Sequence, residues 1–463
     1  MIRTPVVVRR SAVLLALALA ACGDTAKPVP RTKSLAAHPQ WARDAVIYEV
    51  NVRQFTPEGT FKALESHLAR LDSLGVDILW LMPVQPIGIA GRKGILGSYY
   101  AVADYRRTNP EFGTQADLKA VIDSAHALGL KVILDWVPNH TANDHTWITA
   151  HPDWYLRNAD GTISVARNNE DQPTDWTDVA ELDYTSAEMR LAMIADMTWW
   201  MTDMGIDGFR QDVAGGVPMA FWRQARTALA AAKPDVFMLA ESERPLDHDA
   251  FDATYGWEFH HLLNAIAQGK EPVGRIDDYL AKQQREYPAN AFRMYFTSNH
   301  DENSWQGTEF ERMGDDHRPA FVLAATLANS FPLLYTGQEA GLNKRLRFFQ
   351  KDTVSWADRS LTPFYRTLFD LKARVPALWN GAEGGTQVRL AGTGAEGVYA
   401  FTRTTGESQL VVAVNFSDAP ATFAYTGLGA PGRYKDAFTE AAVELGAAGT
   451  IALPAHGYVV LSR

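Results

Sequence analysis

The stretch Ile206-Asp-Gly-Phe-Arg-Gln-Asp212 places charged side chains at the end of a short apolar run that is typical of a buried strand. Alternate residues of a strand face the same side, so Arg210 and Asp212 put a guanidinium and a carboxylate on one face of the strand end. A neighbouring fixed cation favours the ionised carboxylate, which suits a nucleophile or an electrostatic stabiliser rather than a proton donor. An Arg-x-Asp pair is by itself most often an ordinary ion pair, so the interpretation depends on the other strand ends.

Seven more segments share this short, apolar character. They are residues 45–52, 76–82, 131–137, 236–241, 253–256, 293–299 and 333–336. Helical patterns separate most of them, with apolar residues every three or four positions, and Thr114 with Asp117 forms a capping-box-like start for one helix. Continuous apolar runs indicate strands that are buried on both faces. Eight such strands alternating with helices predict an α/β fold, the (β/α)8 TIM barrel.

Two regions depart from this alternation. A polar, Trp- and Asp-rich stretch over residues 141–190 follows the third strand, and we expect this excursion to pack over one end of the barrel. Beyond Trp379 the chain changes to short alternating strands separated by Gly and Pro turns, at 398–402, 409–415, 421–425 and 458–461. The predicted organisation is a catalytic barrel over residues 41–379, including the excursion, and a C-terminal antiparallel β domain over residues 380–463.

The N-terminus has the features of a targeting signal. Three arginines precede an apolar run at residues 11–21 that is too short to span a bilayer. The run ends Leu19-Ala-Ala-Cys22, which resembles the lipobox of bacterial lipoproteins. Residues 1–22 are therefore predicted to be a signal peptide ending at a lipidated Cys22, and residues 23–40 a flexible tether. The alternative is a plain secretory signal in which Cys22, the only cysteine, is incidental.

This interpretation predicts an exported protein that is lipid-anchored to the bacterial cell envelope, on its periplasmic or surface face. The chain has 463 residues, of which 46% are hydrophobic and 21% charged, as in soluble globular proteins. Its formal net charge of −10 argues against nucleic acid as a partner. The membrane is a predicted partner only through the lipid.

In a parallel barrel the carboxyl ends of all strands meet at one rim, where catalytic residues gather. Asp212, Glu241 and Asp301 end three different strands and would face one another there, although like charges repel. A site that must stabilise a positive charge gives a reason to gather carboxylates. Glycosidic cleavage is such a reaction, because its transition state is oxocarbenium-like. Burial and neighbouring negative charge should keep Glu241 protonated as the acid, while His140 and His300, with Asp301, could hydrogen-bond sugar hydroxyls.

Four segments carry a resemblance to a known family, the α-amylase family of retaining glycoside hydrolases. In chain order they are Asp135-Trp-Val-Pro-Asn-His140, Gly208-Phe-Arg-Gln-Asp212, Met238-Leu-Ala-Glu241 and Phe296-Thr-Ser-Asn-His-Asp301. Each alone could arise by chance, but all four in the correct order are specific. The resemblance covers roughly residues 41–463, because the β domain after the barrel also fits.

The resemblance implies an enzyme that cleaves α-1,4-glucosidic bonds in starch-like glucans or maltooligosaccharides by double displacement. It implies Asp212 as nucleophile, Glu241 as acid and base, and Asp301 as support for the transition state. Upstream, Gly97-Ser-Tyr-Tyr100 resembles the segment where the family places an aromatic ring against the cleaved sugar, which by spacing is Tyr100. The two carboxyl groups of Asp212 and Glu241 should then approach within roughly 5–5.5 Å.

Alternatives remain at two levels. Within the family, a cyclomaltodextrinase, an α-glucosidase or a transglycosylase is the near alternative. In another class, a non-catalytic glycan-binding surface lipoprotein is disfavoured by the intact set of acids with Arg210. A metal-dependent barrel hydrolase needs clustered His and Asp ligands, and only His140 and His300 qualify.

No cofactor is predicted to be required, but the resemblance leaves a calcium ion open near Asn139 and Glu181, which would supply hard oxygen ligands. Two positions depart from the family pattern. Gly215-Gly216 stands where the family often has Lys-His, which removes a side chain that contacts the leaving-group sugar in many members.

Overall fold

The structure, a computed structural model, describes residues 38–168, 171–394 and 396–463. The predicted signal peptide with Cys22, and the tether up to residue 37, lie outside the described residues. Among the residues that are described, none of the helices combines the length and the apolar character needed to cross a membrane.

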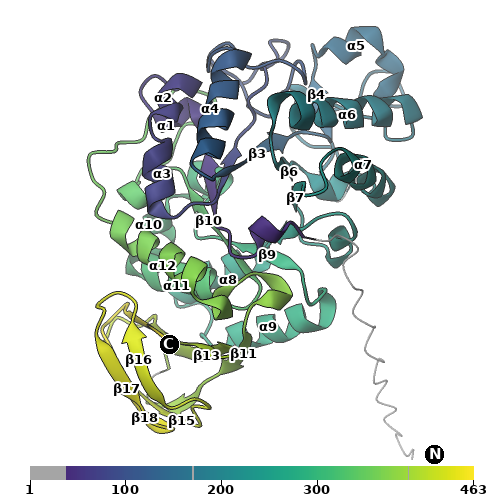
Figure 1. Cartoon of the computed structure of the whole chain (residues 1–463). Coiled ribbons are helices and arrows are strands. Elements are labelled where there is room, and N and C mark those ends of the chain that lie inside the picture. The colour runs from purple at the N-terminus through teal and green to yellow at the C-terminus, as the bar shows by residue number, and fades with distance from the viewer. Residues whose placement is uncertain (1–37, 169–170, 395) are drawn as a thin grey trace, which may run out of the picture. The chain divides into compact units, whose positions relative to one another are not determined.

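Eight parallel strands close into a barrel in the order β1-β2-β3-β6-β7-β8-β9-β10 (Figure 1). Their bounds are β1 Ile47–Val50, β2 Ile78–Leu81, β3 Lys131–Trp136, β6 Gly208–Gln211, β7 Phe237–Ala240, β8 Ala253–Tyr255, β9 Phe292–Tyr295 and β10 Ser330–Tyr335. Every predicted strand corresponds to one of these, so the predicted TIM barrel is confirmed.

Helices lie outside the strands. They are α1 Val52–Phe55, α2 Phe61–Glu65, α3 Leu68–Leu74, α4 Gln115–Ala127, α5 Thr146–Ala150, α6 Ala187–Trp199, α7 Met219–Ala232, α8 Trp257–Ala267, α9 Arg275–Glu286, α10 Glu309–Met313, α11 His317–Thr326 and α12 Thr362–Arg374. The capping box that the sequence predicts at the start of α4 is present, since Thr114 accepts from the Asp117 N–H and the Asp117 carboxylate accepts from the Thr114 N–H.

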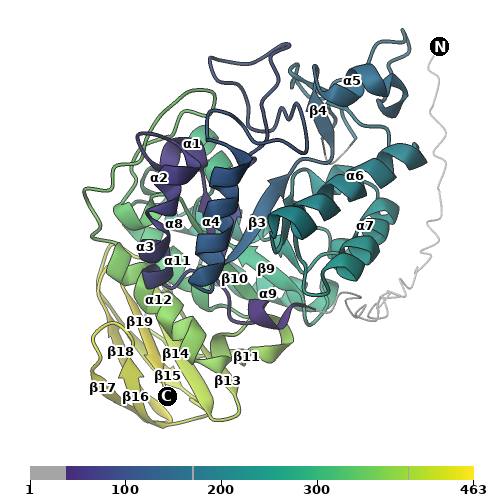
Figure 2. The same cartoon turned by 45° about the horizontal axis from the view of Figure 1, so that its top comes forward.

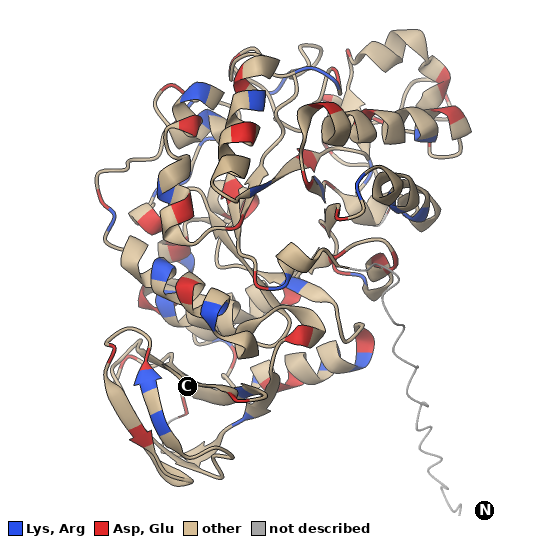
Figure 3. Cartoon of the chain, in the orientation of Figure 1, with Lys and Arg blue, Asp and Glu red and all other residues tan. Residues whose placement is uncertain are grey.

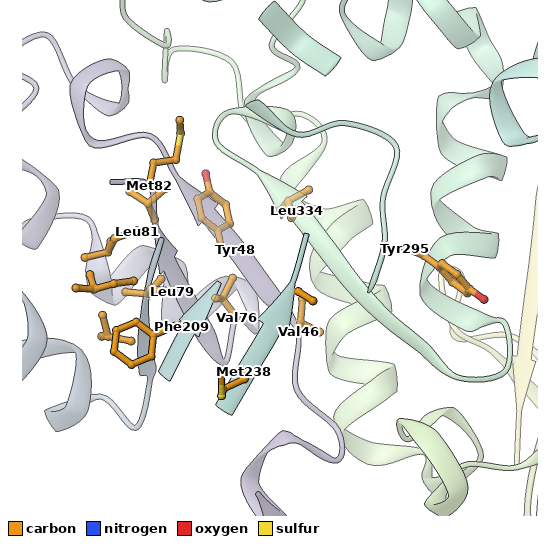
Figure 4. Close-up of a cluster of buried hydrophobic side chains, with 14 of the residues drawn as sticks. Val46, Tyr48, Val76, Leu79, Leu81, Met82, Phe209, Met238, Tyr295 and Leu334 are labelled. Carbon is orange, nitrogen blue, oxygen red and sulfur yellow. The ribbon is translucent and has the colours of Figure 1, made fainter. Parts of the chain in front are cut away.

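Both faces of the barrel strands are buried, and alternate residues belong to different cores. Ile47, Ile78 and Ile133 fill the barrel interior, whereas the residues that follow them pack against the helices. Figure 4 shows part of this outer core, where Leu79, Phe209, Met238 and Leu334 from four strands lie together with their neighbours. Burial on both faces explains the continuous apolar runs in the sequence. It also means that an interior charged residue must find a partner inside the barrel.

The excursion after β3 is confirmed. It contains a two-stranded antiparallel sheet of β4 (His140–Ala142) and β5 (Val179–Glu181), together with α5. After the excursion the chain continues into α6, which lies beside α7 in both views of the molecule (Figures 1 and 2).

The C-terminal residues form antiparallel sheets, as predicted. Their strands are β11 Thr386–Arg389, β12 Ala391–Thr393, β13 Val398–Thr405, β14 Ser408–Asn415, β15 Ala421–Thr426, β16 Gly432–Asp436, β17 Ala442–Leu445, β18 Ala448–Leu453 and β19 Tyr458–Ser462. The buried Arg403 guanidinium donates to the carbonyls of Thr326 and Leu327 after α11, so this domain is bonded to the barrel.

Charged side chains of both signs are intermixed on the described helices rather than gathered in a band of one sign (Figure 3).

Candidate active site

The strand pairing explains why Arg210 and Asp212 point into the barrel. On β6, Gly208 lies inside, and a Cβ there would approach the Phe237 carbonyl oxygen to 2.0 Å, so only glycine fits. Arg210 follows two residues later on the same interior face and pairs in register with Asp135 of β3. Asp212 comes next, just beyond the end of β6, and the Glu241 N–H donates to the Gln211 carbonyl on the neighbouring strand. Asp212 and Glu241 are therefore neighbours at the barrel rim.

The Arg210 guanidinium lies at the centre of the site and is fully buried. Its Nη1 donates to Asp135 Oδ1 at 2.8 Å and to Asp212 Oδ1 at 3.0 Å. Its Nη2 forms an ion pair with Glu241 Oε1 at 2.8 Å. One planar cation thus contacts three carboxylates, two of which are predicted catalytic acids. The pKa of Arg210 is raised well above its usual value, because the charges of Asp135 and Glu241 outweigh its burial, so it stays charged.

Glu241 is held from two sides. Besides the ion pair with Arg210, its Oε2 accepts a hydrogen bond from the Val213 N–H at 2.8 Å. Val213 is the residue after Asp212 and has a left-handed backbone with φ of 44°, which is uncommon for a β-branched residue and marks a constrained turn. The turn ties the positions of the two acids to each other.

The protonation of Asp212 differs from the sequence expectation. Burial and the nearby Glu241 carboxylate raise the pKa of Asp212 well above its usual value, and Arg210 opposes this shift without cancelling it. Arg210 therefore does not by itself hold the pKa of Asp212 low, as the sequence alone suggests. Because Arg210 is shared with Asp135 and Glu241, its charge is not available to Asp212 alone. The repulsion from the Glu241 carboxylate and the burial of Asp212 together oppose its ionisation.

A second cation, His300, lies on the other side of the site. Its Nδ1 contacts Glu49 Oε1 at 2.5 Å, and its Nε2 lies 3.4 Å from Asp301 Oδ2. Burial by itself would lower the pKa of His300, but the carboxylates of Asp301 and Glu49 raise it to about 9, so the ring is an imidazolium at neutral pH. The Tyr100 hydroxyl lies 2.7 Å from His300 Nε2 and donates to Asp135 Oδ2 at 3.0 Å. These contacts fix the Tyr100 ring beside Asp301.

A cavity of about 490 Å³ opens above these groups. It is lined by six of the residues that the sequence analysis selected, namely Tyr100, His140, Asp212, Glu241, His300 and Asp301. Arg210 lies below its floor. Burial lowers the pKa of His140 to about 4, so this ring is a neutral hydrogen-bonding group. The structure thus brings the selected catalytic and substrate-binding residues to one place.

The aromatic residues around the site divide into two groups. Trp176, Trp257 and Trp305 line the cavity, and Trp305 is half exposed. Trp154 and Tyr155 are buried instead, Trp154 stacking on His151 and the Tyr155 hydroxyl lying 2.9 Å from that of Thr141. They serve the packing of the excursion.

Two functional neighbours were missed by the sequence reasoning. Glu49 is an acid inside an otherwise apolar strand, and its carboxylate pairs with His300. Asp135 lies in β3, where its carboxylate pairs with Arg210. It also accepts hydrogen bonds from the Tyr100 hydroxyl and the Trp80 indole N–H. An acid within an apolar strand is itself a signal, because a buried charge needs a partner. That signal was available for both residues.

Asn139 and Glu181 lie together but are paired as hydrogen-bonding groups. The Asn139 side-chain nitrogen donates to Glu181 Oε2 at 3.1 Å and to the Arg167 carbonyl at 3.0 Å. Glu181 Oε2 also accepts from the Arg167 N–H at 2.8 Å. A calcium ion needs converging oxygen atoms, whereas here an amide nitrogen faces the carboxylate, so these residues as arranged do not fit the ion. Among the described residues no group of three or more His, Cys, Asp or Glu side chains is arranged to hold a metal.

Comparison with known families agrees with the four motifs. The chain matches the α-amylase catalytic domain over residues 37–389 and the α-amylase C-terminal all-beta domain over residues 393–461. The first match alone spans more than half of the 463 residues. The chain therefore belongs to the α-amylase family of glycoside hydrolases, and the resemblance stated from the sequence is confirmed.

Individual relatives agree with this assignment. The α-amylase MalA of Haloarcula japonica is 28% identical over 426 residues, which cover 86% of this chain and 60% of MalA, so this chain spans less than two thirds of that relative. Two solved structures are similar along nearly their whole length. The noncanonic maltogenic α-amylase AmyB from Thermotoga neapolitana has a TM-score of 0.81 and 28% identity, covering 90% of this chain and 98% of AmyB. An α-amylase from Lactobacillus plantarum has a TM-score of 0.79 and 32% identity, covering 91% and 99%.

Proposed function

We propose that this protein is a retaining glycoside hydrolase that cleaves α-1,4-glucosidic bonds in starch-like glucans or maltooligosaccharides. The observation that carries the proposal is the pair Asp212 and Glu241, held side by side by one buried guanidinium beneath a cavity of about 490 Å³. Double displacement at an anomeric carbon requires two adjacent carboxyl groups, one that attacks and one that donates a proton.

In the first step the Asp212 carboxylate attacks the anomeric carbon while Glu241 gives its proton to the glycosidic oxygen. The bond to the leaving sugar breaks, and a glycosyl ester forms on Asp212. In the second step Glu241, now a carboxylate, takes a proton from water, and the resulting oxygen nucleophile displaces Asp212. The anomeric configuration is inverted twice and is therefore retained. This division of roles is supported by the family's motifs. The contacts of Arg210 do not assign the roles, because Arg210 pairs with both acids.

The surrounding charges favour the transition state. Five carboxyl groups, those of Glu49, Asp135, Asp212, Glu241 and Asp301, face the two cations Arg210 and His300. An excess of acid groups is costly to the folded state but stabilises the positive charge that develops on the sugar ring. Asp301, with a side chain 38% exposed, is the most exposed of the three predicted acids, which suits contact with the sugar hydroxyls.

Related enzymes support an α-glucan substrate and leave the near alternatives in place. Relatives are named α-amylase, maltogenic α-amylase and, at 25% identity, cyclomaltodextrinase. Cyclomaltodextrinase, α-glucosidase or transglycosylase action are second candidates of the same class. A non-catalytic glycan-binding role is disfavoured because Asp212, Glu241, Asp301 and Arg210 are all present and lie together. We also propose that the protein acts at the cell envelope, held by a lipid on Cys22.

The test is a product time course on maltoheptaose, amylose and β-cyclodextrin with the wild type, Asp212→Asn and the surface control Asp123→Asn. We expect linear glucans to be cleaved to α-configured products, with Asp123→Asn unchanged. Asp212→Asn should lose at least about three orders of magnitude in rate, as for a catalytic group that acts as part of a unit. Absence of cleavage by the wild type, or near-normal turnover by Asp212→Asn, would refute the proposal.

A further inference from the structure

We infer that the donor side of the cavity is closed by a fixed wall, so that the enzyme acts at the non-reducing ends of short glucans rather than within long chains. The inference rests on the proposed function and adds to it the mode of attack. The wall is defined as residues 86–97 of the loop after β2 together with residues 344–351 of the loop after β10.

The chemistry decides which side is the donor side. Glu241 protonates the leaving oxygen, so the leaving sugar lies beside Glu241, toward Val213 and Trp257. The sugar that is attacked must then lie over Tyr100, His300 and Asp301, and the rest of the donor chain extends beyond them. On that side the Tyr100 ring stacks on Phe348, with centroids 6.2 Å apart and planes 12° apart. Phe348 in turn contacts Phe349 and Trp305. The donor chain therefore runs toward Phe348 and Phe349.

Near Phe348 and Phe349 the path of the donor chain meets the loop after β2. The Leu96 N–H donates to the Phe349 carbonyl at 3.0 Å. Gly94 lies against Phe349 so closely that an added Cβ would come within 2.5 Å of the Phe349 Cβ, and its φ of 63° also favours glycine. The two loops are thus packed directly against each other, with no room for a sugar ring between Gly94 and Phe349.

A buried arginine below the wall joins the same two loops. Arg53 is 2% exposed, and its guanidinium donates to the carbonyls of Leu96 at 3.3 Å, Gly97 at 3.1 Å and Phe348 at 3.4 Å. It also lies over the Tyr99 ring, 4.2 Å from the centroid. One cation satisfying carbonyls from both loops holds them in a single arrangement, because releasing either loop would leave buried polar groups unpaired.

The other end of the wall is bonded to the excursion. The Ile89 and Ala90 N–H groups donate to Asp144 Oδ2 at 2.7 and 3.1 Å. Lys93 donates to the Asp175 carbonyl at 3.0 Å and forms an ion pair with Asp178 at 3.6 Å. Lys93 and Asp178 both line the cavity, and Asp178 is only 4% exposed. The pair therefore spans the cavity edge and places one donor and one acceptor where the terminal hydroxyls of a donor chain would end.

The loop after β10 is fixed to the loop after β9 in the same way. Asn303 donates to the Lys344 carbonyl and accepts from the Leu346 N–H, and Ser304 donates to the Leu346 carbonyl. The excursion and the loops after β2, β10 and β9 thus form a continuous bonded arc around the donor side. On the leaving side, by contrast, Gly215 and Gly216 carry no side chains. The arc contributes Lys93, Phe348 and Phe349 to the lining of the cavity of about 490 Å³.

The test compares two substrates with the wild-type enzyme. One is maltoheptaose, and the other is maltoheptaose whose terminal non-reducing 4- and 6-hydroxyls are blocked by an ethylidene group, with products followed by mass spectrometry. We expect the blocked substrate to be cleaved at least about 100-fold more slowly, because a closed wall excludes the added bulk. The free substrate should release short products from its non-reducing end from the first time point.

The outcomes separate this inference from the proposed function. Equal cleavage of both substrates, with mid-chain products, would overturn the wall while leaving the hydrolase intact. Failure to cleave the free substrate would instead refute the proposed function.

Two variants test whether these residues make the wall. Lys93→Ala removes the bridge to Asp178, and Phe349→Ala removes the ring against Gly94. Each should raise the ratio of blocked to free cleavage at least about 10-fold, with an unchanged melting temperature as the check on folding. Lys119→Ala, which removes another Lys–Asp ion pair on the outer face of α4, should leave the ratio unchanged. A ratio that stays at the wild-type value in both wall variants would overturn the assignment.

Discussion

At the scale of single residues, Arg210 is the side chain that holds the acids of the site together. It touches Asp135, Asp212 and Glu241 at once and is buried beneath the cavity. A side chain with five donors in a rigid fork can make such contacts, whereas lysine offers a single charged nitrogen. Because the guanidinium is divided among three carboxylates, its charge does not cancel the effects of burial and of Glu241 on the pKa of Asp212.

His300 provides a prediction about pH. Its pKa in the folded protein is about 9, above the ordinary 6.5, because Asp301 and Glu49 outweigh its burial. Groups with a raised pKa stabilise the fold fully below the unfolded pKa, and this contribution is lost as pH rises through the folded pKa. The melting temperature of wild type should therefore exceed that of His300→Gln most at pH 6, and the gap should narrow between pH 6.5 and pH 9. A gap that is constant over pH 6 to 10 would contradict the protonated state.

At the scale of elements, α4 is the helix whose start was predicted from sequence and found in the structure. Thr114 and Asp117 satisfy each other's backbone N–H groups. Thr114→Ala should lower the free energy of unfolding by about 1 kcal/mol, measured by denaturant or thermal unfolding. Thr114→Ser keeps the capping hydroxyl and should restore most of the loss. An unchanged stability in Thr114→Ala would show that the cap contributes nothing here.

The pairing of β4 with β5 carries a prediction about calcium. Asn139 and Glu181, which the sequence left open as calcium ligands, bond to each other through the Asn139 amide nitrogen. Since that bond already satisfies the carboxylate, we propose that the excursion needs no ion. Treatment with EGTA should leave the melting temperature and the activity unchanged. A fall in melting temperature that added Ca²⁺ reverses would instead show that the ion reorganises this pair.

At the scale of the whole molecule, the barrel was predictable and the wall was not. Buried strands can be predicted locally, because each is a continuous apolar run in the sequence. The acids at the ends of β6, β7 and β9 follow such runs directly and can be predicted with them. The contacts of Glu49 with His300, and of Leu96 with Phe349, join residues more than 200 positions apart. No local pattern encodes such pairings. The strands β11, β12, β16, β17 and β18 were missed because most of their residues are exposed, so they carry only short apolar runs.

The pKa shift of Asp212 is a further property that could not be predicted from the sequence. Its neighbour Arg210 is visible in the sequence, but Asp135 and Glu241, which share that arginine, come from other strands. The sign of the shift depends on all three carboxyls and on burial, and only the folded arrangement determines it.

The N-terminal signal carries the prediction about localisation. We expect a bacterial host to process the chain before Cys22 and to attach lipid there. In metabolic labelling with a palmitate analogue, the wild type should incorporate label and fractionate with membranes. Cys22→Ser should do neither while keeping its activity on maltoheptaose. A wild-type protein free of label would support the plain secretory signal, and label on Cys22→Ser would show that the lipid is attached at another residue.

The central claim is that Asp212 and Glu241 act as nucleophile and acid at one anomeric carbon. The most direct measurement uses Glu241→Gln with α-maltosyl fluoride, whose leaving group needs no protonation, followed by intact-mass and peptide mass spectrometry. We expect a covalent maltosyl adduct on the peptide that contains Asp212. The double variant Asp212→Asn/Glu241→Gln should form no such adduct. An adduct on another residue, or fluoride release with inversion at the anomeric carbon, would contradict the central claim.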